Sequence, residues 1–384
     1  MNGRENIGFF KTTKLTYFLF GGYWLFSFFE GYISGSFGSI SKYYIFVLIL
    51  YLLYKSKKLV ITKQHGIIAL WAVYYFATLL WTPHFDLAMT YFNSVMGMTV
   101  LLLLILGTRF EKKFVEWTLK CVTICSFLLG LLGIFFSKDY LGRISSRRVL
   151  TLFGTQLDPN NLVALYAYGL CLGLYYLVFT DISFKRKMFY ILGVSITAFD
   201  ILMTGSRSGI IVIAAALFIV ITKKKEGESQ LITFAKRAAF IIGLIILMRV
   251  LLSLLPADIL LRITGGDKNL SFTDSTGRTE RWQQGLRYWW NTNPIFGCGW
   301  GAFECHGTFF TLLVDTGLIG ITLFVGNLIY ITYQCIKRKK YQGLMIEISG
   351  LIPAFLIGAQ NRRFFWNAII LPVMILNAIG DEDE

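Results

Sequence analysis

The sequence is poor in charge, proline and histidine. Charged residues make up 15% of its 384 residues, and it contains 6 Pro and 3 His. A soluble protein of this length needs more charged side chains to cover its surface. With 34 Phe, 20 Tyr and 9 Trp, the chain is also too aromatic for a disordered or low-complexity protein. These shortages indicate a polytopic membrane protein.

The scarcity of histidine also limits the chemistry. His65, His84 and His306 are scattered along the chain without clustered carboxylates, so no metal site is expected. The formal net charge of +15 would indicate nucleic-acid binding in a soluble protein. In a membrane protein the distribution of the cations between the two sides is more informative, and no nucleic-acid partner is expected.

About twelve apolar segments predict membrane-spanning helices. A helix needs about 20 residues to cross the hydrocarbon layer. Segments 99–106 and 210–221 lack the alternation of a barrel strand. The sequence therefore predicts an all-α, polytopic membrane protein that forms a single integral domain over residues 1–384. The expected helices occupy residues 15–33, 40–55, 65–82, 86–107, 114–136, 160–180, 188–204, 208–222, 237–255, 308–335, 344–359 and 364–380.

Lysines predict the orientation of these helices. They precede the first helix and mark every second connection after it, at positions 11–14, 55–63, 112–113, 185–187, 223–225 and 337–340. By the positive-inside rule, these connections and both termini, with the acidic tail 381–384, lie in the cytoplasm. The expected location is the cytoplasmic (inner) membrane, which the chain crosses many times.

Arginines are concentrated on the opposite, outer side. Their planar guanidinium groups match phosphate and carboxylate better than an ammonium group does. The outer face is therefore expected to bind an anionic ligand. The alternative is that single arginines pair with acids or anchor at headgroups; Glu30, inside the first helix, is one such acid. The outer arginines are Arg143, Arg147, Arg148, Arg207, Arg262, Arg278, Arg281, Arg287, Arg362 and Arg363.

Two outer connections are long, at residues 137–160 and 256–305. The second is rich in aromatic residues and is predicted to be an extracytoplasmic loop that carries part of the active site. Within it, residues 279–290 predict a short amphipathic helix capped by Asp274 or Ser275. Aromatic rings beside arginines suit carbohydrate binding, and they also suit the aromatic belt at a membrane surface. Both interpretations remain open at this point.

Three local patterns occur in order along the chain. The first is Gln156-Leu157-Asp158-Pro159-Asn160-Asn161 and the second is Thr204-Gly205-Ser206-Arg207-Ser208-Gly209. The third includes Gly277-Arg278, Trp282, Asn293-Pro294, Gly297-Cys298-Gly299 and His306, and after nine residues (308–316) it ends in Gly317 and Gly320. Together they resemble the O-antigen ligase and polymerase superfamily of polytopic glycosyltransferases. Gly307 departs from the family pattern, which has a hydrogen-bonding side chain there.

The resemblance implies a helical fold whose active site faces away from the cytoplasm. It implies glycan transfer from an undecaprenyl-pyrophosphate donor without a metal, a nucleotide sugar or another cofactor. The growing glycan acceptor, membrane lipid and a candidate chain-length regulator would be the other partners. The residues that it implies as catalytic are His306, Arg207 and Arg278. Candidate substrate-binding residues are Arg281, Arg147, Arg148, Asn160, Asn161 and Trp282.

The chemistry of these residues agrees with such a transfer. The pyrophosphate leaves with negative charge, which fixed guanidinium groups stabilise. A neutral imidazole can take the proton of the acceptor hydroxyl. Asn160 and Asn161 have a structural alternative, the capping of a helix. Cys298 and Cys305 flank the glycine turn and could form a disulfide in an oxidising compartment.

The favoured function is a polymerase for O-antigen, capsule or exopolysaccharide, because the chain is compact and has no soluble extension for a protein acceptor. The alternatives within the family are an O-antigen ligase and a protein O-oligosaccharyltransferase. A different class is a transporter of an anion or of the lipid-linked glycan, since arginines facing one side of a helix bundle would serve it too. A transporter should have broken helices and related halves.

Overall fold

The computed structural model describes residues 9–33, 40–56, 60–141, 147–222, 229–264 and 278–379, and it is 78% helical. The chain forms two compact units: unit 1 contains residues 1–122 and 276–384, and unit 2 contains residues 123–275. Several predicted features lie outside the described residues: Arg143, the lysines at 57–58 and 223–225, the caps Asp274 and Ser275, and the tail 381–384.

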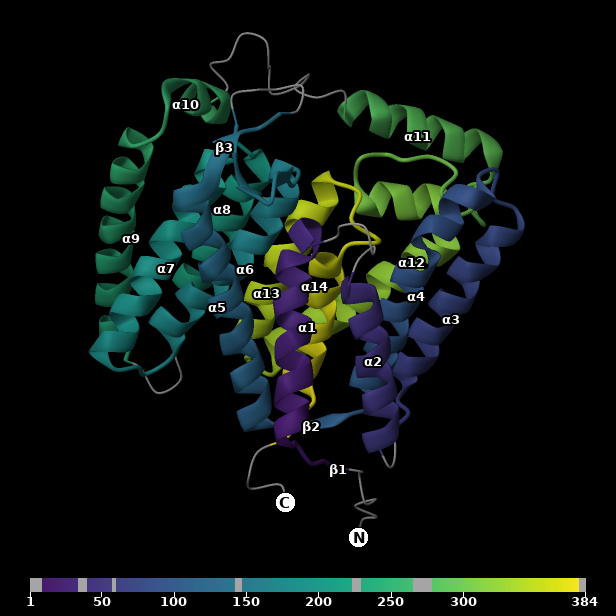
Figure 1. Ribbon diagram of the computed structural model, residues 1–384, viewed down its shortest axis with the longest axis horizontal. Helices are drawn as coiled ribbons and strands as arrows, with labels where there is room; N and C mark the ends of the chain where they lie inside the picture. Colours follow the sequence, from purple (N-terminus) through teal and green to yellow (C-terminus); the bar gives the residue numbers. More distant parts are fainter. Residues whose placement is uncertain are drawn as a thin grey trace. The chain divides into compact units, whose positions relative to one another are not determined.

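The helices and strands of unit 1 are shown in Figure 1. They are β1 (Phe9–Phe10), α1 (Lys14–Ile33), α2 (Ile40–Lys55), α3 (Lys63–Ala77), η1 (Thr78–Leu80), α4 (Phe85–Leu106), β2 (Arg109–Glu111), the start of α5 (Lys112–Phe136), α11 (Arg278–Thr292), α12 (Thr308–Lys337), α13 (Tyr341–Leu356), α14 (Arg363–Leu376) and β6 (Ala378–Ile379).

Unit 2 begins within α5. Its other elements are β3 (Ser137–Asp139), β4 (Arg148–Leu152), β5 (Thr155–Gln156), α6 (Pro159–Phe179), α7 (Phe184–Met203), α8 (Arg207–Thr222), α9 (Gln230–Ser253) and α10 (Ala257–Thr264).

The predicted helical class is confirmed, and each expected apolar segment overlaps a helix of the described chain. The predicted count of about twelve spans is not confirmed. Among the described residues, only α4, α5, α6 and α12 are long and apolar enough to cross a membrane, while α8, α13 and α14 are shorter apolar helices. The amphipathic helix expected at 279–290 is present as α11.

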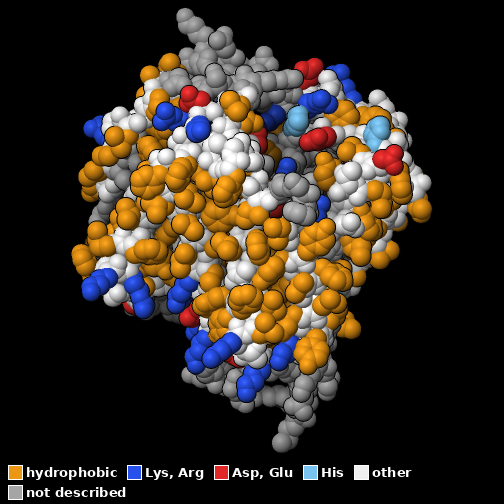
Figure 2. Space-filling model, in the orientation of Figure 1, with side chains coloured by type: hydrophobic (Ala, Val, Ile, Leu, Met, Phe, Trp, Pro, Cys, Tyr) orange, Lys and Arg blue, Asp and Glu red, His pale blue; other side chains and the backbone are white. Residues whose placement is uncertain are grey.

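Each unit has one helix that is almost wholly buried. In unit 1 this is α14, where the residues from Arg363 to Ile375 are all buried against α13, α4, α12 and α1. In unit 2 it is α6, which packs against α7 and α8. A helix that is apolar on all sides is stable only inside a protein or in lipid. The exposed apolar side chains lie on the other helices and in some connections, and Figure 2 shows apolar side chains over much of the face in view.

A parallel sheet joins distant parts of unit 1 at one end of its helices. Its strand order is β1-β2-β6, with Phe9 opposite Arg109 and Phe110 opposite Ala378. The Thr12 backbone N–H and hydroxyl both donate to the Glu111 carboxylate, at 3.0 and 2.7 Å. The first and last described residues therefore lie on the same side as the Lys112–Lys113 connection, as the lysine pattern predicts.

Candidate functional site

The opposite end of unit 1 is organised by a break in α12. Gly317 has φ 62° and ψ −166°, a backbone conformation that is open almost only to glycine. Gly297 also has a positive φ of 83°, and a Cβ on either glycine would collide with the backbone beside the other. The chain at 294–299 therefore packs directly against the interruption. The Gly-x-x-Gly pattern read from the sequence is thus a helix break with a loop seated in it.

This loop pairs the backbone groups that the break leaves open. The N–H groups of Cys298 and Gly299 donate to the carbonyls of Val314 and Asp315, at 2.8 and 3.1 Å. In the other direction, the N–H of Leu318 donates to the carbonyl of Pro294 at 3.0 Å. Buried backbone groups require such partners. The glycine turn is therefore fixed to α12 on both sides of the break.

Two buried side chains also hold the glycine turn against the broken helix, and we call this assembly of turn and helix break the frame. The Asp315 carboxylate is fully buried and accepts a hydrogen bond from the Gly301 N–H at 3.1 Å. The Trp300 ring, 1% exposed, stacks on Tyr75 with centroids 4.4 Å apart. Thr82 and Trp81 donate to the carbonyls of Trp300 and Gly297. The segment leading to His306 is therefore anchored to α3 and α4 as well as to α12.

His306 lies at the end of this frame, just before α12. Its φ is 52°, in the left-handed region that non-glycine residues seldom occupy. The neighbouring backbone is tightly held: the Cys305 N–H donates to Thr311 Oγ1 at 3.2 Å, and the Thr308 N–H and hydroxyl donate to the Ile357 carbonyl at 2.9 and 2.8 Å. Strained backbone persists where the surroundings over-determine it, and such positions cluster at functional sites.

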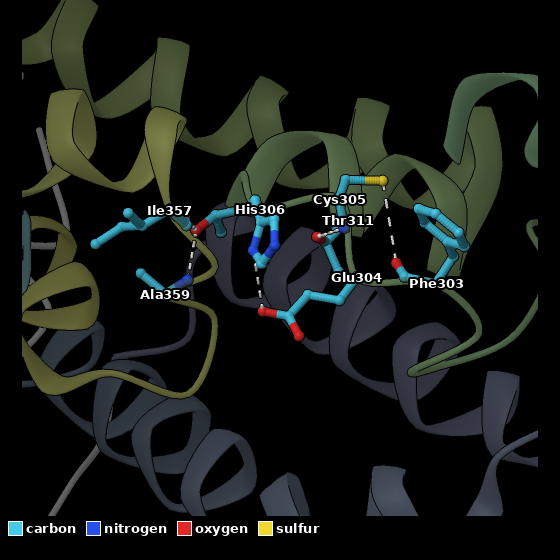
Figure 3. Close-up of polar contacts among 8 residues, drawn as sticks. Phe303, Glu304, Cys305, His306, Thr311, Ile357 and Ala359 are labelled. Carbon is cyan, nitrogen blue, oxygen red and sulfur yellow. Dashed lines mark hydrogen bonds and ion pairs between the residues drawn. The ribbon is translucent and has the colours of Figure 1, made fainter. Parts of the chain in front are cut away.

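The ring of His306 remains accessible although its backbone is fixed. Its side chain is 49% exposed, and Nδ1 lies 3.8 Å from Oε1 of Glu304 (Figure 3). The Ala359 N–H donates to Thr308 Oγ1 at 2.7 Å, so the connection between α13 and α14 is joined to the same corner. An exposed imidazole whose backbone is held rigidly can act on a bound substrate without a backbone movement of the protein.

Helix α11 places Trp282 beside the corner formed by His306, Thr308 and the connection between α13 and α14. The Trp282 ring stacks on Phe310 with centroids 4.7 Å apart and an interplanar angle of 26°. A Cβ on Gly307 would lie 2.8 Å from the Phe355 carbonyl oxygen and 3.2 Å from Trp282 Nε1. The departure from the family pattern at Gly307 therefore has a steric reason, because α11 and α13 approach too closely to admit a side chain there.

The arginines of α11 differ in their exposure. Arg278 begins the helix and is half-buried, while Arg281 is exposed and its guanidinium carbon lies 5.7 Å from the centre of the Phe303 ring. Trp282, one residue later, faces Phe310. Figure 1 shows α11 lying across the ends of α3 and α4 rather than beside them. The predicted grouping of Arg278, Arg281 and Trp282 within one turn is therefore present.

Cys298 and Cys305 share a small buried cluster with Ala302 and Val314. Both are free thiols, so the disulfide considered from the sequence is not formed. Burial raises the pKa of the Cys305 thiol to about 12, with smaller contributions from the Asp315 and Glu304 carboxylates. These cysteines pack as small apolar side chains beneath the loop.

In unit 2 the structure joins the first two sequence patterns. Asp158 caps α6 by accepting hydrogen bonds from the Asn160 N–H and side-chain amide, at 2.8 and 2.9 Å. Ser206 then donates to Asn160 Oδ1 at 2.7 Å. Asn160 is 3% exposed, and it donates to the cap residue Asp158 instead of capping the helix itself. Asn161, the next residue, is half-buried.

Arg207 is the first residue of α8, directly after this hydrogen-bonded pair. The N-terminal ends of α6 and α8 pack together here, and helix N-termini carry partial positive charge. Arg207 is half-buried at this point. An anion would be stabilised by the guanidinium group and by the two helix ends.

Arg147 and Arg148 lie at the start of β4, in the antiparallel sheet β3-β4-β5 that was not expected from the sequence. Arg147 is 7% exposed. Arg148 is more exposed and lies 3.5 Å from the Asp139 carboxylate. The nine predicted site residues thus fall into two groups. His306, Arg278, Arg281 and Trp282 lie in unit 1; Arg207, Arg147, Arg148, Asn160 and Asn161 lie in unit 2.

Some polar residues near these groups were missed. Glu304 lies two positions before His306, and Gln360 belongs to the short polar sequence Gln-Asn-Arg-Arg at 360–363. Polar residues in a short outer connection between apolar helices were the available signal. Within the described part of the chain, no group of three or more His, Cys, Asp or Glu residues could hold a metal ion.

The comparison with known families agrees with this geometry. Residues 192–325 match the family model described as O-antigen ligase. Over this segment the chain is similar to the O-antigen ligase family. The matched segment begins within α7 and ends within α12, so it includes Arg207, Arg278 and His306 and the break at Gly317. The match supports the O-antigen ligase and polymerase superfamily, and with the apolar helices it indicates a multi-pass membrane protein. No curated protein matches the chain.

Proposed function

We propose that this protein is a polysaccharide polymerase that joins undecaprenyl-pyrophosphate-linked repeat units on the outer face of the cytoplasmic membrane. Members of the superfamily are glycosyltransferase-like enzymes that act on lipid-linked glycans. The observation that carries the proposal is His306. Its ring is 49% exposed while its left-handed backbone is held by hydrogen bonds on both sides. This is the arrangement that a fixed general base needs.

The proposed reaction is a single displacement. His306 removes the proton from a hydroxyl group of the acceptor sugar, and that oxygen attacks the anomeric carbon of the donor sugar. The bond between the anomeric carbon and the pyrophosphate oxygen breaks, and the bonding pair leaves with the undecaprenyl pyrophosphate. The protonated imidazole then releases its proton to solvent. One displacement inverts the anomeric carbon.

The arginines stabilise the leaving group in this proposal. Negative charge grows on the pyrophosphate as the bond breaks, and fixed guanidinium groups are most effective where charge develops. Arg207 has support from the adjoining N-termini of α6 and α8. Arg278 has the same role on α11, at the edge of the corner that holds His306. The guanidinium fork binds two phosphate oxygens at once, which an ammonium group does not.

The transporter alternative has one feature in its favour, because α12 is broken at Gly317. In transporters, unwound backbone at such breaks coordinates the cargo. Here the open N–H and carbonyl groups are taken up by the glycine turn at 294–299 instead. The break therefore holds the loop that leads to His306 in place. This favours an enzyme that acts at the membrane surface over a transporter.

The proposal is tested with purified protein in vesicles that contain the lipid-linked repeat unit as both donor and acceptor. A polymerase produces a ladder of longer lipid-linked glycans. A ligase produces no ladder until lipid A core is added, an oligosaccharyltransferase requires an added acceptor protein, and a transporter moves the substrate between leaflets without lengthening it. The first result supports the proposal, and each of the other three overturns it.

Variants test the assigned roles in the same assay. His306→Ala and His306→Gln should both reduce transfer by about 10²–10⁴-fold, because neither side chain can accept the proton. Arg207→Lys and Arg278→Lys should each reduce the transfer rate by about 10²–10³-fold, because lysine keeps the positive charge but cannot bind two phosphate oxygens at once as the guanidinium group does. Arg281→Lys, one turn along the same helix, should be tolerated better than Arg278→Lys. Transfer at the parental rate by His306→Gln would show that His306 is not the general base.

A further inference from the structure

Two polar atoms beside His306 are buried without a hydrogen-bond partner. They are Oε1 of Gln360 and the indole Nε1 of Trp282. Leaving such an atom unpaired costs about 1–3 kcal/mol, so native proteins rarely retain one without a reason. One is an acceptor and the other a donor. A ligand with hydroxyl groups would pair both once the two side chains turn toward it, since a hydroxyl donates and accepts.

The position of Gln360 is set by its neighbours. The Trp366 indole N–H donates to the Gln360 carbonyl at 2.8 Å. A Cβ built on Gly358 would lie 3.6 Å from Gln360 Oε1 and 3.4 Å from Glu304 Oε1. The amide and the carboxylate therefore flank the same glycine. The hydrogen bonds of Thr308 to Ile357 and Ala359 attach this glycine to the corner that carries His306.

Trp282 closes the other side of the same corner. Its Nε1 would be 3.2 Å from a Cβ on Gly307, the residue directly after His306. Its ring packs on Phe310 and lies edge-on to Phe355, with centroids 6.3 Å apart. Aromatic rings next to polar groups form the usual surface for a sugar, whose C–H groups pack on the ring while its hydroxyls bind the polar atoms. Trp282 Nε1 therefore lies beside the residue that follows His306, and Gln360 Oε1 lies beside Gly358, which also adjoins Glu304.

We propose that Trp282, Glu304 and Gln360 form, around His306, the subsite for the hydroxyl-bearing acceptor sugar. The Gln360 amide binds a sugar hydroxyl, and the negative Glu304 carboxylate, 3.8 Å from His306 Nδ1, favours a proton on Nδ1 so that Nε2 faces the acceptor as the base. This rests on the proposed function and identifies the half of the site that takes the acceptor.

Gln360 lies outside the matched family segment, which ends at residue 325, whereas His306 lies inside it. The base thus lies within the matched segment, and the contact from Gln360 comes from the connection between α13 and α14, outside that segment. Differences in that connection would change which sugar is accepted without changing the chemistry. Gln360 is therefore assigned as a specificity-determining residue.

The test uses Gln360→Leu, which keeps the size of the side chain and removes its amide. We expect the KM for the acceptor to rise about tenfold, with the KM for the donor unchanged, since one hydrogen bond to a sugar is lost. The melting temperature should stay the same or rise, because a buried unpaired oxygen is removed. A purely structural Gln360 would instead lower the melting temperature and leave the acceptor KM unchanged, which would overturn the assignment.

The matched control is Gln342→Leu, at the opposite end of α13. It should leave both KM values at the parental level. Glu304→Gln should lower kcat and leave the acceptor KM nearly unchanged, with Glu304→Asp restoring part of kcat. An unchanged kcat in Glu304→Gln would refute the orienting role.

A binding measurement separates failure of this inference from failure of the proposed function. The probe is the oligosaccharide repeat unit released from the host strain's own surface polysaccharide, free of lipid, observed by saturation-transfer NMR. His306→Ala should bind the probe without transferring it, and Gln360→Leu should lose most of the binding. Equal binding by the parent and Gln360→Leu overturns the subsite alone. A parent that transfers glycan in the vesicle assay but does not bind the probe likewise overturns the subsite alone. A parent that neither binds the probe nor transfers glycan overturns both.

Discussion

Gly317 offers the sharpest test of how this site is built. Its φ of 62° with ψ of −166° lies in a region that is almost exclusive to glycine. A Cβ there would also overlap the Ile295 carbonyl and the Gly297 nitrogen. Gly317→Ala should therefore force either α12 or the glycine turn to move.

The cost can be worked out from these two effects. Holding alanine in that backbone region costs about 1–3 kcal/mol, and forcing a methyl group into filled space costs about 1–3 kcal/mol more. The free energy of unfolding should fall by about 2–6 kcal/mol in total. In the same helix, Gly326 is exposed and a Cβ on it would meet nothing within 4 Å. Gly326→Ala should therefore gain up to about 1 kcal/mol from its helix propensity.

The assay compares thermal unfolding of the two variants in detergent, beside the vesicle transfer assay. Gly317→Ala should melt about 3–10 °C below the parent and lose transfer, because the segment before His306 is mounted on the break. Gly326→Ala should melt at or above the parental temperature and remain active. Equal melting temperatures for the two variants would refute the argument that the break is held by glycine-only packing.

Two further predictions concern buried groups. Arg363, 2% exposed, is 3.3 Å from Glu30 and donates to Ser94 at 2.8 Å. Glu30→Leu leaves the buried Arg363 unpaired and should lower the free energy of unfolding by about 3 kcal/mol. Arg363→Met should lower it by less, because the Glu30 that remains is 25% exposed and can be hydrated. Thermal unfolding that ranks the two variants in the opposite order would contradict this. Burial raises the pKa of Cys305 from 9.0 to about 12, so the neutral thiol is favoured in the folded state. Its contribution to stability is present below pH 9 and is lost as the pH rises toward 12. At pH 8.5 iodoacetamide should modify Cys305 only after denaturation, as measured by mass spectrometry. Rapid modification of Cys305 in the folded protein would contradict its burial.

The sequence alone determined the helices, because apolar runs of the right length have few other stable structures in lipid. It also predicted α11 from its amphipathic period, and it identified Glu30 as an acid that an arginine would neutralise. The structure supplies that arginine as Arg363, from α14. These features depend on short stretches of chain or on a charge that must be neutralised, so local chemistry is enough to predict them.

Other features depended on residues far apart in the chain. The β1-β2-β6 sheet pairs residues near positions 9, 109 and 378, and such short strands carry no local signal. Glu30 has company that the sequence analysis did not single out, since Asp200, Asp315 and Glu347 are also buried in helices. Each is tolerated because of its tertiary surroundings, as when Glu347 accepts from the Thr332 hydroxyl at 2.8 Å.

The site shows the same division. The sequence pointed to His306, Gly317 and the arginines through the resemblance of three local patterns to a known family, and their roles stay predictions. Only the tertiary structure decided that Gly317 breaks α12, that Gly297 fills the break, and that Gln360 belongs beside His306. The physical reason is that these relations are contacts between backbones and side chains of separate segments. Their energies come from packing and hydrogen bonds that exist only once α11, α12 and α13 have assembled.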